Sequence, residues 1–235
     1  VKITSNDNVK ISADQSEYIK LTNELFLNGN VEIIDQDKEI RIQSEKVRYY
    51  KNKELIQSIG ATNIDFGNNY TIDTTDLDYL RLKKILKSNK KTILYDNFNN
   101  EVETDSFVFY ANEKKFKSKN LKLKDNNLNE YIAKESLIDL NKNKIAAKDI
   151  EIYFSKTGNL GENSRLKGNY MISDDNITII EKGIFTSCKP RNDCPPWTMQ
   201  SETIKHNKKK KLIEYKNAWL KLYDKPVFYF PKFFH

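Results

Sequence analysis

The ten residues "CKPRNDCPPW" (188–197) hold both cysteines of the chain, which are its most reactive side chains. Two thiols could ligate a metal, form a redox pair or close a disulfide. Two cysteines without a nearby histidine cannot supply the four ligands of a structural zinc site. Five residues separate Cys188 from Cys194, which excludes a C-x-x-C redox motif. A disulfide remains, and closing so short a loop would stabilise the fold by about 2 kcal/mol. Its formation would require an oxidising compartment, the periplasm or the cell exterior.

Other residue types that catalyse reactions are sparse. The chain has two histidines, of which His206 lies beside a lysine run and His235 is the last residue. No HExxH, GxSxG or glycine-rich phosphate-binding motif occurs, and there are only 7 glycines. The carboxylates are scattered over predicted turns and form no acid/base pair. The sequence therefore predicts no catalytic residue, no metal site, no cofactor and no enzymatic activity.

The net charge of +7 suits anionic partners such as nucleic acid, anionic lipid or acidic glycan. It is equally consistent with a genome-wide bias, because lysine, asparagine and isoleucine abound throughout the chain. The basic run "KHNKKKKL" (205–212) contains no interleaved aromatic residue that could stack on bases. It is better interpreted as a hairpin turn between "WTMQSETIK" and "LIEYKNAWLKL", so we expect no nucleic-acid partner. No apolar run reaches the 18 residues that a transmembrane helix needs.

The elements that must position any site are repeated. Four stretches align without gaps at a spacing of 30 residues: "IQSEKVRYY" (42–50), "IDTTDLDYL" (72–80), "VETDSFVFY" (102–110) and "IAKESLIDL" (132–140). Hydroxyl side chains repeat at the same spacing, in Ser44, Thr74 and Thr104 and again in Ser58, Ser88 and Ser118. Such a period is typical of stacked repeats that bury a shared core.

Inside each copy the apolar residues alternate, and the alternation changes parity between residues 44 and 47. Alternation indicates a strand, and a parity change indicates a bend or bulge. Polar turns follow at "YKNKE" (50–54) and "YANEKK" (110–115). The segment "LDYLRLKKILKS" (77–88) has a helix-like composition, but it aligns with strands in the sister copies. The predicted fold is all-β, a solenoid, jellyroll or elongated sandwich of repeats of about 30 residues.

Three segments carry a resemblance to a known family: "GIFTSC" (183–188), "CPPW" (194–197) and "YKNAWLKLYDKPVFYFPKFFH" (215–235). They resemble the LptD family of outer-membrane lipopolysaccharide (LPS) assembly proteins, also called organic solvent tolerance proteins. The matching residues are Thr186, Cys188, Pro196, Trp197, Pro226, Val227, Tyr229 and Pro231. Upstream, "LFLNGNVEI" (25–33) resembles strands of the OstA-like domain, which this family shares with the periplasmic bridge protein LptA.

The resemblance implies an elongated OstA-like β-jellyroll over residues 1–224, with an open groove between two sheets. Its repeat units would lie near 42–58, 72–88, 102–118 and 132–147. Residues 225–235 would connect it to a transmembrane β-barrel that is not present in this chain. In the family, cysteines of this domain can bond to cysteines of the barrel. Cys188 matches the family position and is the candidate for such a bond, and Cys194 could pair with Cys188 or with the barrel.

The function that the resemblance implies is transport at the periplasmic face of the outer membrane. The jellyroll would accept the acyl chains of LPS from LptA and pass them to the barrel. LptA would dock by edge-strand addition near residues 1–12, and the lipoprotein LptE would bind through the barrel. The alternative is a stand-alone stacked-β binding module, either a bridge protein or an adhesin-like binder of glycans or proteins.

The repeats also nominate the residues that would line the groove. Their inward positions are Ile42, Val47, Ile72, Leu77, Val102, Phe107, Ile132 and Leu137. From periodicity alone these side chains could equally form a closed core. The resemblance to the LptD family implies that these side chains contact acyl chains.

Overall fold

The computed structural model describes residues 1–4, 8–67, 69–97, 100–125, 128–155, 164–188 and 195–234. Within these ranges the chain is built of β-strands with one short 3-10 turn, η1 (Lys51–Lys53), which confirms the predicted all-β fold. No helix in these ranges is long and apolar enough to cross a membrane. The strands are β1 (Lys2–Thr4), β2 (Val9–Ser12), β3 (Gln15–Ile19), β4 (Glu24–Asp35), β5 (Ile40–Tyr50), β6 (Leu55–Phe66), β7 (Tyr70–Thr75), β8 (Asp78–Leu80), β9 (Ile85–Ser88), β10 (Thr92–Asp96), β11 (Glu101–Thr104), β12 (Ser106–Tyr110), β13 (Lys115–Lys124), β14 (Glu130–Asp139), β15 (Lys144–Tyr153), β16 (Arg165–Ser173), β17 (Ile177–Thr186), β18 (Trp197–Asn207), β19 (Leu212–Leu222) and β20 (Lys225–Phe234).

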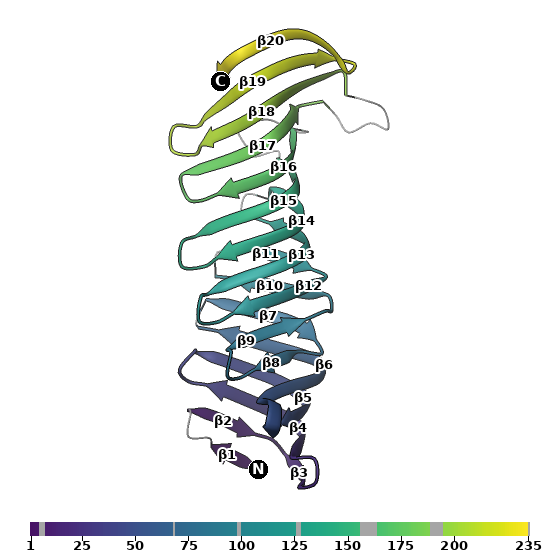
Figure 1. Ribbon diagram of the computed structural model, residues 1–235, viewed down its shortest axis with the longest axis vertical. Helices are drawn as coiled ribbons and strands as arrows, with labels where there is room; N and C mark the ends of the chain where they lie inside the picture. The colour runs from purple at the N-terminus through teal and green to yellow at the C-terminus, as the bar shows by residue number, and fades with distance from the viewer. Residues whose placement is uncertain are drawn as a thin grey trace. The chain divides into compact units, whose positions relative to one another are not determined.

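The chain divides into two units, which we call unit 1 (Val1–Ser118) and unit 2 (Lys119–His235). Figure 1 labels the strands and colours them by residue number, from purple through teal to yellow. The division falls within the region 1–224 that the sequence assigns to one domain. In both units neighbouring strands are antiparallel, so short hairpin turns connect most of them.

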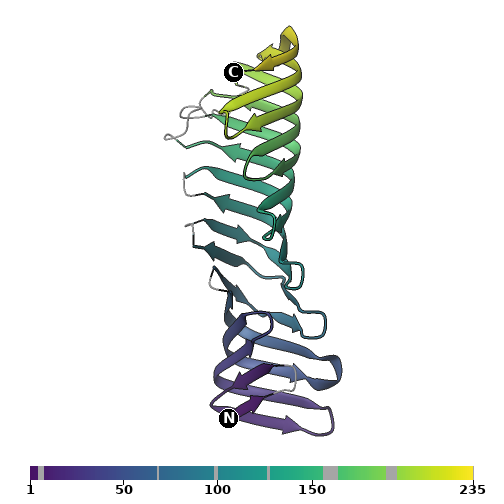
Figure 2. The same ribbon diagram turned by 90° about the vertical axis from the view of Figure 1, so that its left-hand side faces the viewer.

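In unit 1 each long strand belongs to two half-sheets. The second half of β6, Ala61–Phe66, pairs with β7, while its first half, Leu55–Gln57, pairs with β8. We call the half-sheet that contains β2, β7, β10 and β11 half-sheet A, and the one that contains β3, β8, β9 and β12 half-sheet B. Figure 2 shows the hairpins that result, in purple to blue. The two half-sheets face each other across an apolar interior.

The corner between the half-sheets lies where the sequence predicts a parity change. The pairing of β5 with β6 shifts in register between Ser44 and Lys46, and Ile42 and Val47 on either side are both buried. The side-chain alternation therefore changes phase at a bulge, which turns the strand. Gly60, at φ +88°, takes the corner of β6 in a left-handed conformation that glycine adopts without cost.

Buried hydroxyls complete the hydrogen bonding at these corners. The Ser58 hydroxyl accepts a hydrogen bond from the Leu77 amide at 2.9 Å, and the Thr74 and Thr92 hydroxyls lie 2.7 Å apart. The Ser88 hydroxyl donates to the Thr75 carbonyl at 2.8 Å. The hydroxyl repeat of the sequence is thus structural, because it satisfies backbone groups where the ladder is interrupted.

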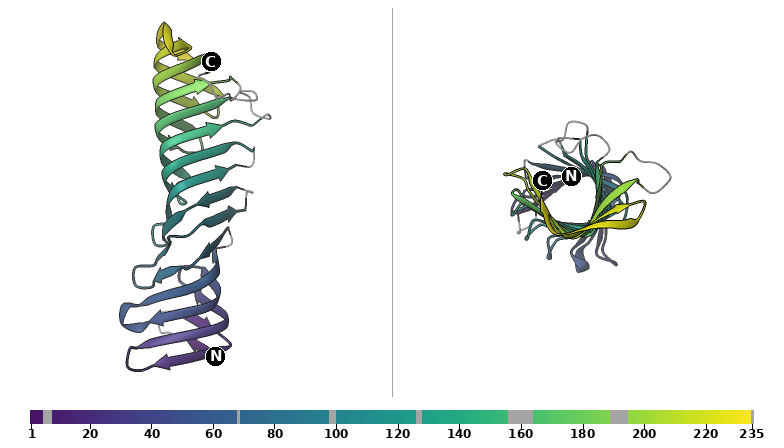
Figure 3. Two further views of the ribbon diagram at one scale, coloured as in Figure 1. Left: turned by 90° about the vertical axis from the view of Figure 1, so that its right-hand side faces the viewer. Right: turned by 90° about the horizontal axis from the view of Figure 1, so that it is seen from above.

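In unit 2 the strands β14 to β20 form a meander in which each strand pairs with its sequence neighbours. These strands run through their bends without interruption, as the teal-to-yellow ribbons of Figure 3 (left) show. The predicted turn of the lysine run is confirmed, because β18 ends at Asn207 and β19 begins at Leu212. Residues 225–234, predicted as a connector, form β20, which pairs with β19.

Residues with a left-handed backbone conformation lie at the ends of the turns, and their spacing shows the length of each copy of the repeat. Glu54, Lys84 and Lys114 follow one another at 30 residues, with φ between 48° and 52° at the ends of equivalent turns. Asn143, at φ 47°, takes this place in the turn between β14 and β15, only 29 residues after Lys114. A strand that is one residue out of register presents its side chains to the opposite face.

Candidate functional site

Half-sheet A of unit 1 carries one continuous apolar row on its inner face. Each member is the direct cross-strand partner of the next, and each is buried. The row is Ile11, Ile33, Ile42, Ile64, Ile72, Leu94 and Val102. It unites the three groove residues predicted on this half-sheet, Ile42, Ile72 and Val102.

Half-sheet B contributes the opposite wall. Val47, Leu77 and Phe107, the three groove residues predicted here, are 1–2% exposed. The Phe107 ring stacks on Phe116 with centroids 5.3 Å apart. In unit 1 the structure therefore brings all six predicted residues into one apolar interior. Their contact with lipid stays a prediction.

The two predicted groove residues of unit 2 lie differently. Ile132 is half-buried, and Leu137 is 39% exposed. Ala133 and Ser136 occupy the buried positions of β14 instead, 31 residues after Val102 and 29 after Phe107, so the fourth copy does not keep the spacing of 30. The inner row of unit 2 runs through Ser136, Ala147, Met171, Ile180, Ile204 and Tyr215. Aligning the turns rather than the apolar residues would have found it.

Two polar clusters lie at the edge of the unit 1 interior. The first centres on Asp35, which is fully buried at the end of β4. The Tyr79 hydroxyl and the Lys84 ammonium group each donate to its Oδ2 at 2.5 Å. Sequence reasoning missed this cluster, because its members are 44 and 49 residues apart and carry no motif.

In the second cluster Arg81 donates to the hydroxyl of Tyr49 and to the carboxylate of Glu54, both at 2.8 Å. The hydroxyl in turn donates to Glu54. Burial and the hydrogen bond to Glu54 raise the pKa of Tyr49 to about 12. The phenol therefore stays protonated at physiological pH.

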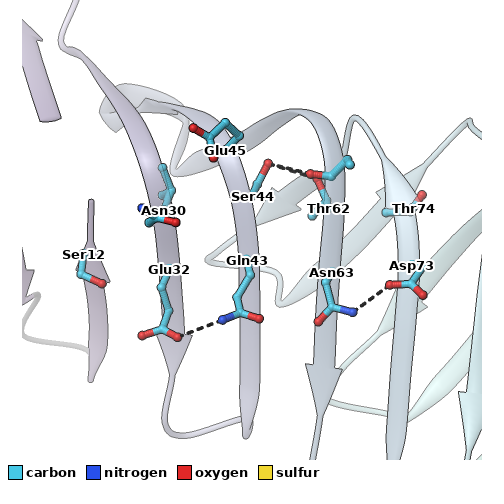
Figure 4. A pocket seen from close by; sticks show the side chains of 12 residues that line it. Ser12, Asn30, Glu32, Gln43, Ser44, Glu45, Thr62, Asn63, Asp73 and Thr74 are labelled. Carbon is cyan, nitrogen blue, oxygen red and sulfur yellow. Dashed lines mark hydrogen bonds between the residues drawn. The ribbon is translucent and has the colours of Figure 1, made fainter. Parts of the chain in front are cut away.

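The outer face of half-sheet A carries a polar hollow of 660 Å³ (Figure 4). Its floor is a cross-strand series of side chains that share hydrogen bonds, with Gln43 donating to Glu32 at 3.3 Å and Asn63 to Asp73 at 2.8 Å. Amides and carboxylates suit hydrated groups and cannot bind acyl chains. Among the described residues no group of three or more histidine, cysteine or acidic residues could hold a metal ion.

The predicted motif residues near the cysteines come together at the ends of β17 and β18. Thr186 donates to the Trp197 carbonyl at 2.7 Å and accepts from the Cys188 amide at 3.2 Å. The Trp197 ring lies 6.0 Å from Phe185, and the Pro196 carbonyl accepts from the Tyr223 amide. These contacts give the motif a structural role. Cys194 lies outside the described residues, so its pairing with Cys188 or another thiol stays a prediction.

The remaining motif residues, Pro226, Tyr229 and Pro231, lie on β20 together with Val227. The Tyr229 ring packs 5.0 Å from Trp219, and its hydroxyl donates to Asn217 at 3.0 Å. Most side chains of β20 are exposed. Within the described residues this apolar strand pairs with β19 alone.

The sequence comparison finds a relative in the family that the sequence resembles. Over 86 residues the chain is 31% identical to the LPS-assembly protein LptD of Sodalis glossinidius (strain morsitans). The alignment covers 36% of this chain and 11% of that protein, so the chain spans about a tenth of the relative's length. The resemblance to LptD is thereby confirmed. None of the family models matches the chain.

Among solved structures, the chain is similar to LptH of Pseudomonas aeruginosa, described as the LptA homologous periplasmic component of the lipopolysaccharide transport device. The TM-score is 0.42 at 12% identity, with 48% of this chain and 82% of that chain covered.

Proposed function

We propose that this chain is a lipid-transport module of the LPS-assembly pathway, which accepts acyl chains in the apolar interior between its half-sheets. The observation that carries the proposal is the unbroken apolar row from Ile11 to Val102, faced by Val47, Leu77 and Phe107. A row that continues across so many strands offers a track rather than a single pocket. The similarity to LptD supports the assignment of the lipid.

The energetics favour the interior over the basic surface as the source of affinity. Burying hydrocarbon is worth about 0.8 kcal/mol per CH₂, so one twelve-carbon chain gains roughly 8–10 kcal/mol. An exposed lysine–phosphate pair contributes about 0.2–1 kcal/mol. The interior of unit 1 is filled by its own side chains, so part of this gain offsets the separation of the half-sheets.

The proposal extends to location and partners. The module would work at the periplasmic face of the outer membrane and pass LPS on to a translocon that includes LptE. A bridge protein of the LptA kind would dock by edge-strand addition at the N-terminal end. There, within the described residues, β1 pairs only with β2, and β3 only with β4.

Photo-crosslinking tests the lipid site. A benzophenone amino acid replaces Phe107, which faces the interior, or Val108, which faces the other side of the same strand. With purified LPS we expect the adduct at position 107 to exceed that at position 108 by about tenfold. Equal labelling at the two positions, in proteins with the same melting curve, would refute an interior lipid track.

Deletion of residues 1–12 tests the docking site. The deletion removes β1 and β2 and should abolish binding of the bridge protein in a pull-down. The matched control is Ser16→Pro in β3, which disturbs the edge strand of half-sheet B, leaves β1 and β2 in place and should retain binding if the bridge protein adds to β1. Full binding by the deleted protein would count against N-terminal docking.

A further inference from the structure

The tips of the two half-sheets of unit 1 meet along the side of the interior that lies opposite the corners. We call this line of contact the seam. On half-sheet A it is reached by the C-terminal ends of β4 and β6, and on half-sheet B by β8, β12 and the turns that follow them. Two sets of contacts, which we call rungs, cross it.

The polar rung is the Asp35 cluster. Asp35 comes from β4 on half-sheet A, whereas Tyr79 and Lys84 come from β8 and its turn on half-sheet B. Both donate to the same carboxylate oxygen at 2.5 Å, and the other oxygen, Oδ1, is buried without a hydrogen-bond partner among the described residues. The rung therefore joins the half-sheets through one incompletely satisfied carboxylate.

The apolar rung is its equivalent one repeat later. Phe109 stands 30 residues after Tyr79, and Lys114 stands 30 after Lys84. Their partner on half-sheet A is Phe66 at the end of β6, whose ring meets Phe109 edge-on at 4.7 Å between centroids. The Lys114 ammonium group lies 5.9 Å from the centre of the Phe66 ring. Phe66 and Phe109 are both buried, so this rung is a hydrocarbon contact with no unsatisfied group in its centre.

The two rungs differ in how readily they separate. A buried ion pair gives up much of its attraction to desolvation, and an orphaned carboxylate oxygen adds to that cost. When the polar rung opens, water hydrates both charged groups and offsets the lost ion pair. When the apolar rung opens, the two aromatic rings are exposed to water, and no favourable hydration offsets that cost.

We propose that the seam of unit 1 opens at the polar rung, with the Asp35–Lys84 pair acting as the latch that controls lateral access of an acyl chain to the interior. This inference rests on the proposed function for its ligand, whereas the latch itself stands on the contacts. The apolar rung is the second contact across the same seam, and it keeps the half-sheets together while the latch is open.

Cysteine labelling measures opening of the seam without any lipid. In a Cys188→Ser, Cys194→Ser background, a reporter cysteine replaces Ile40, the buried cross-strand partner of Asp35, or Val31, buried beside the corner of β4. Lys84→Met leaves the Asp35 carboxylate without its cation. It should raise maleimide labelling at position 40 at least about tenfold, with little change at position 31. Faster labelling at both positions would mean general loosening and would overturn the latch, as would no change at either.

Two further variants sharpen this test. Asp35→Leu, Lys84→Met and Tyr79→Phe together replace the ion pair and the hydroxyl that donates to it by hydrocarbon. This triple variant should return the labelling rate at position 40 to the original value or below. Lys114→Met removes the equivalent lysine from the apolar rung and should leave that rate unchanged. A labelling increase in Lys114→Met equal to that in Lys84→Met would contradict the assignment of the latch to the polar rung.

Uptake of a dansyl-labelled undecanoic acid links the latch to the ligand. We expect its association rate to rise in Lys84→Met and to fall back in the triple variant, as the labelling rate at position 40 does. If labelling changes as predicted but no variant binds the probe, the proposed lipid function fails and the latch stands. If all variants bind the probe and labelling is equal throughout, the latch fails and the function stands.

Discussion

Unit 1 and unit 2 solve the same problem, turning a strand through a corner, in two different ways. Unit 1 interrupts several of its strands at the corner, as between β7 and β8, and satisfies the backbone groups there with buried hydroxyls such as Ser58 and Ser88. Unit 2 keeps its strands continuous and places small residues at the bend. A Cβ atom on Gly168 would lie 2.2 Å from Ile180 Cγ2, and one on Gly183 would lie 2.4 Å from Ile204 Cδ1. A strand can therefore turn a corner either with hydrogen bonds from buried hydroxyls or by lacking a side chain where a neighbour packs against the backbone.

The largest expected difference between the units concerns equivalent repeat positions. Phe107→Asp places a carboxylate in the closed interior of unit 1 and should cost at least about 4 kcal/mol, enough to unfold the unit. Leu137→Asp, 30 residues on, changes a side chain that is 39% exposed and should alter stability by about 0.5 kcal/mol or less. Urea unfolding followed by circular dichroism measures both. Comparable losses would show that β14 has the register of the earlier copies after all.

The second difference concerns the corner glycines. Gly168→Ala should destabilise unit 2 by about 1–3 kcal/mol through overpacking, and Ile180→Ala should partly compensate in the double variant. Gly60 has open space around its Cβ position and a left-handed backbone, so Gly60→Asn should be tolerated far better than Gly60→Val. Thermal unfolding of these variants separates the two causes. A Gly168→Ala protein as stable as the parent would remove the steric account of the unit 2 corner.

The third difference concerns the corner hydroxyls. Ser58→Ala leaves the buried Leu77 amide without its acceptor and should cost about 1–3 kcal/mol, whereas Ser58→Thr should retain most of the stability. In unit 2 the carbonyls of Thr203 and Lys216 share the single proton of the Ser201 hydroxyl, so Ser201→Ala should cost about half as much. The measurement is the urea midpoint of each variant. A larger loss for Ser201→Ala than for Ser58→Ala would reverse the proposed division between the units.

The smallest difference concerns charge on the outer faces. In unit 2 a hydrogen bond from Lys167 lowers the pKa of Glu151 on the neighbouring strand. The pair should contribute about 0.2–1 kcal/mol above the ordinary pKa of the carboxyl group, and this should vanish as the pH falls through its lower folded-state pKa. In unit 1 Asn63 donates to Asp73 without a cation. Salt should therefore weaken the effect of Lys167→Met and leave that of Asn63→Ala unchanged, as pH- and salt-dependent melting can check.

The fold followed from the sequence where local pattern decides it. Alternation and the 30-residue period predicted the strands, the turn at 50–54 and the strand character of residues 77–88, where β8 and β9 lie. The interior positions of unit 1 followed as well, because Ile42 and Phe107 keep the phase of the repeat. In unit 2 that phase is lost, because the buried Ala133 and Ser136 are three positions apart whereas Val102 and Phe107 are five apart, and apolar matching alone passed over the change.

The candidate site was less predictable. The Asp35, Tyr79 and Lys84 side chains meet only because half-sheet A faces half-sheet B, and nothing local in the sequence marks their pairing. The division at residue 118 was also invisible, since no proline or glycine marks a linker in the sequence around it. Long-range facing of elements is the information that periodicity does not contain.

The meander of unit 2 has a consequence for the order in which the chain can assemble. Every strand from β15 to β19 finds both of its partners next to it in the sequence. Each new hairpin can therefore add to a finished edge as soon as it becomes available, at a low entropic cost of loop closure. In unit 1 the pairing of β7 with β10 must wait for β8 and β9 to be placed. Growth of the meander from one end needs no rearrangement of what has already formed.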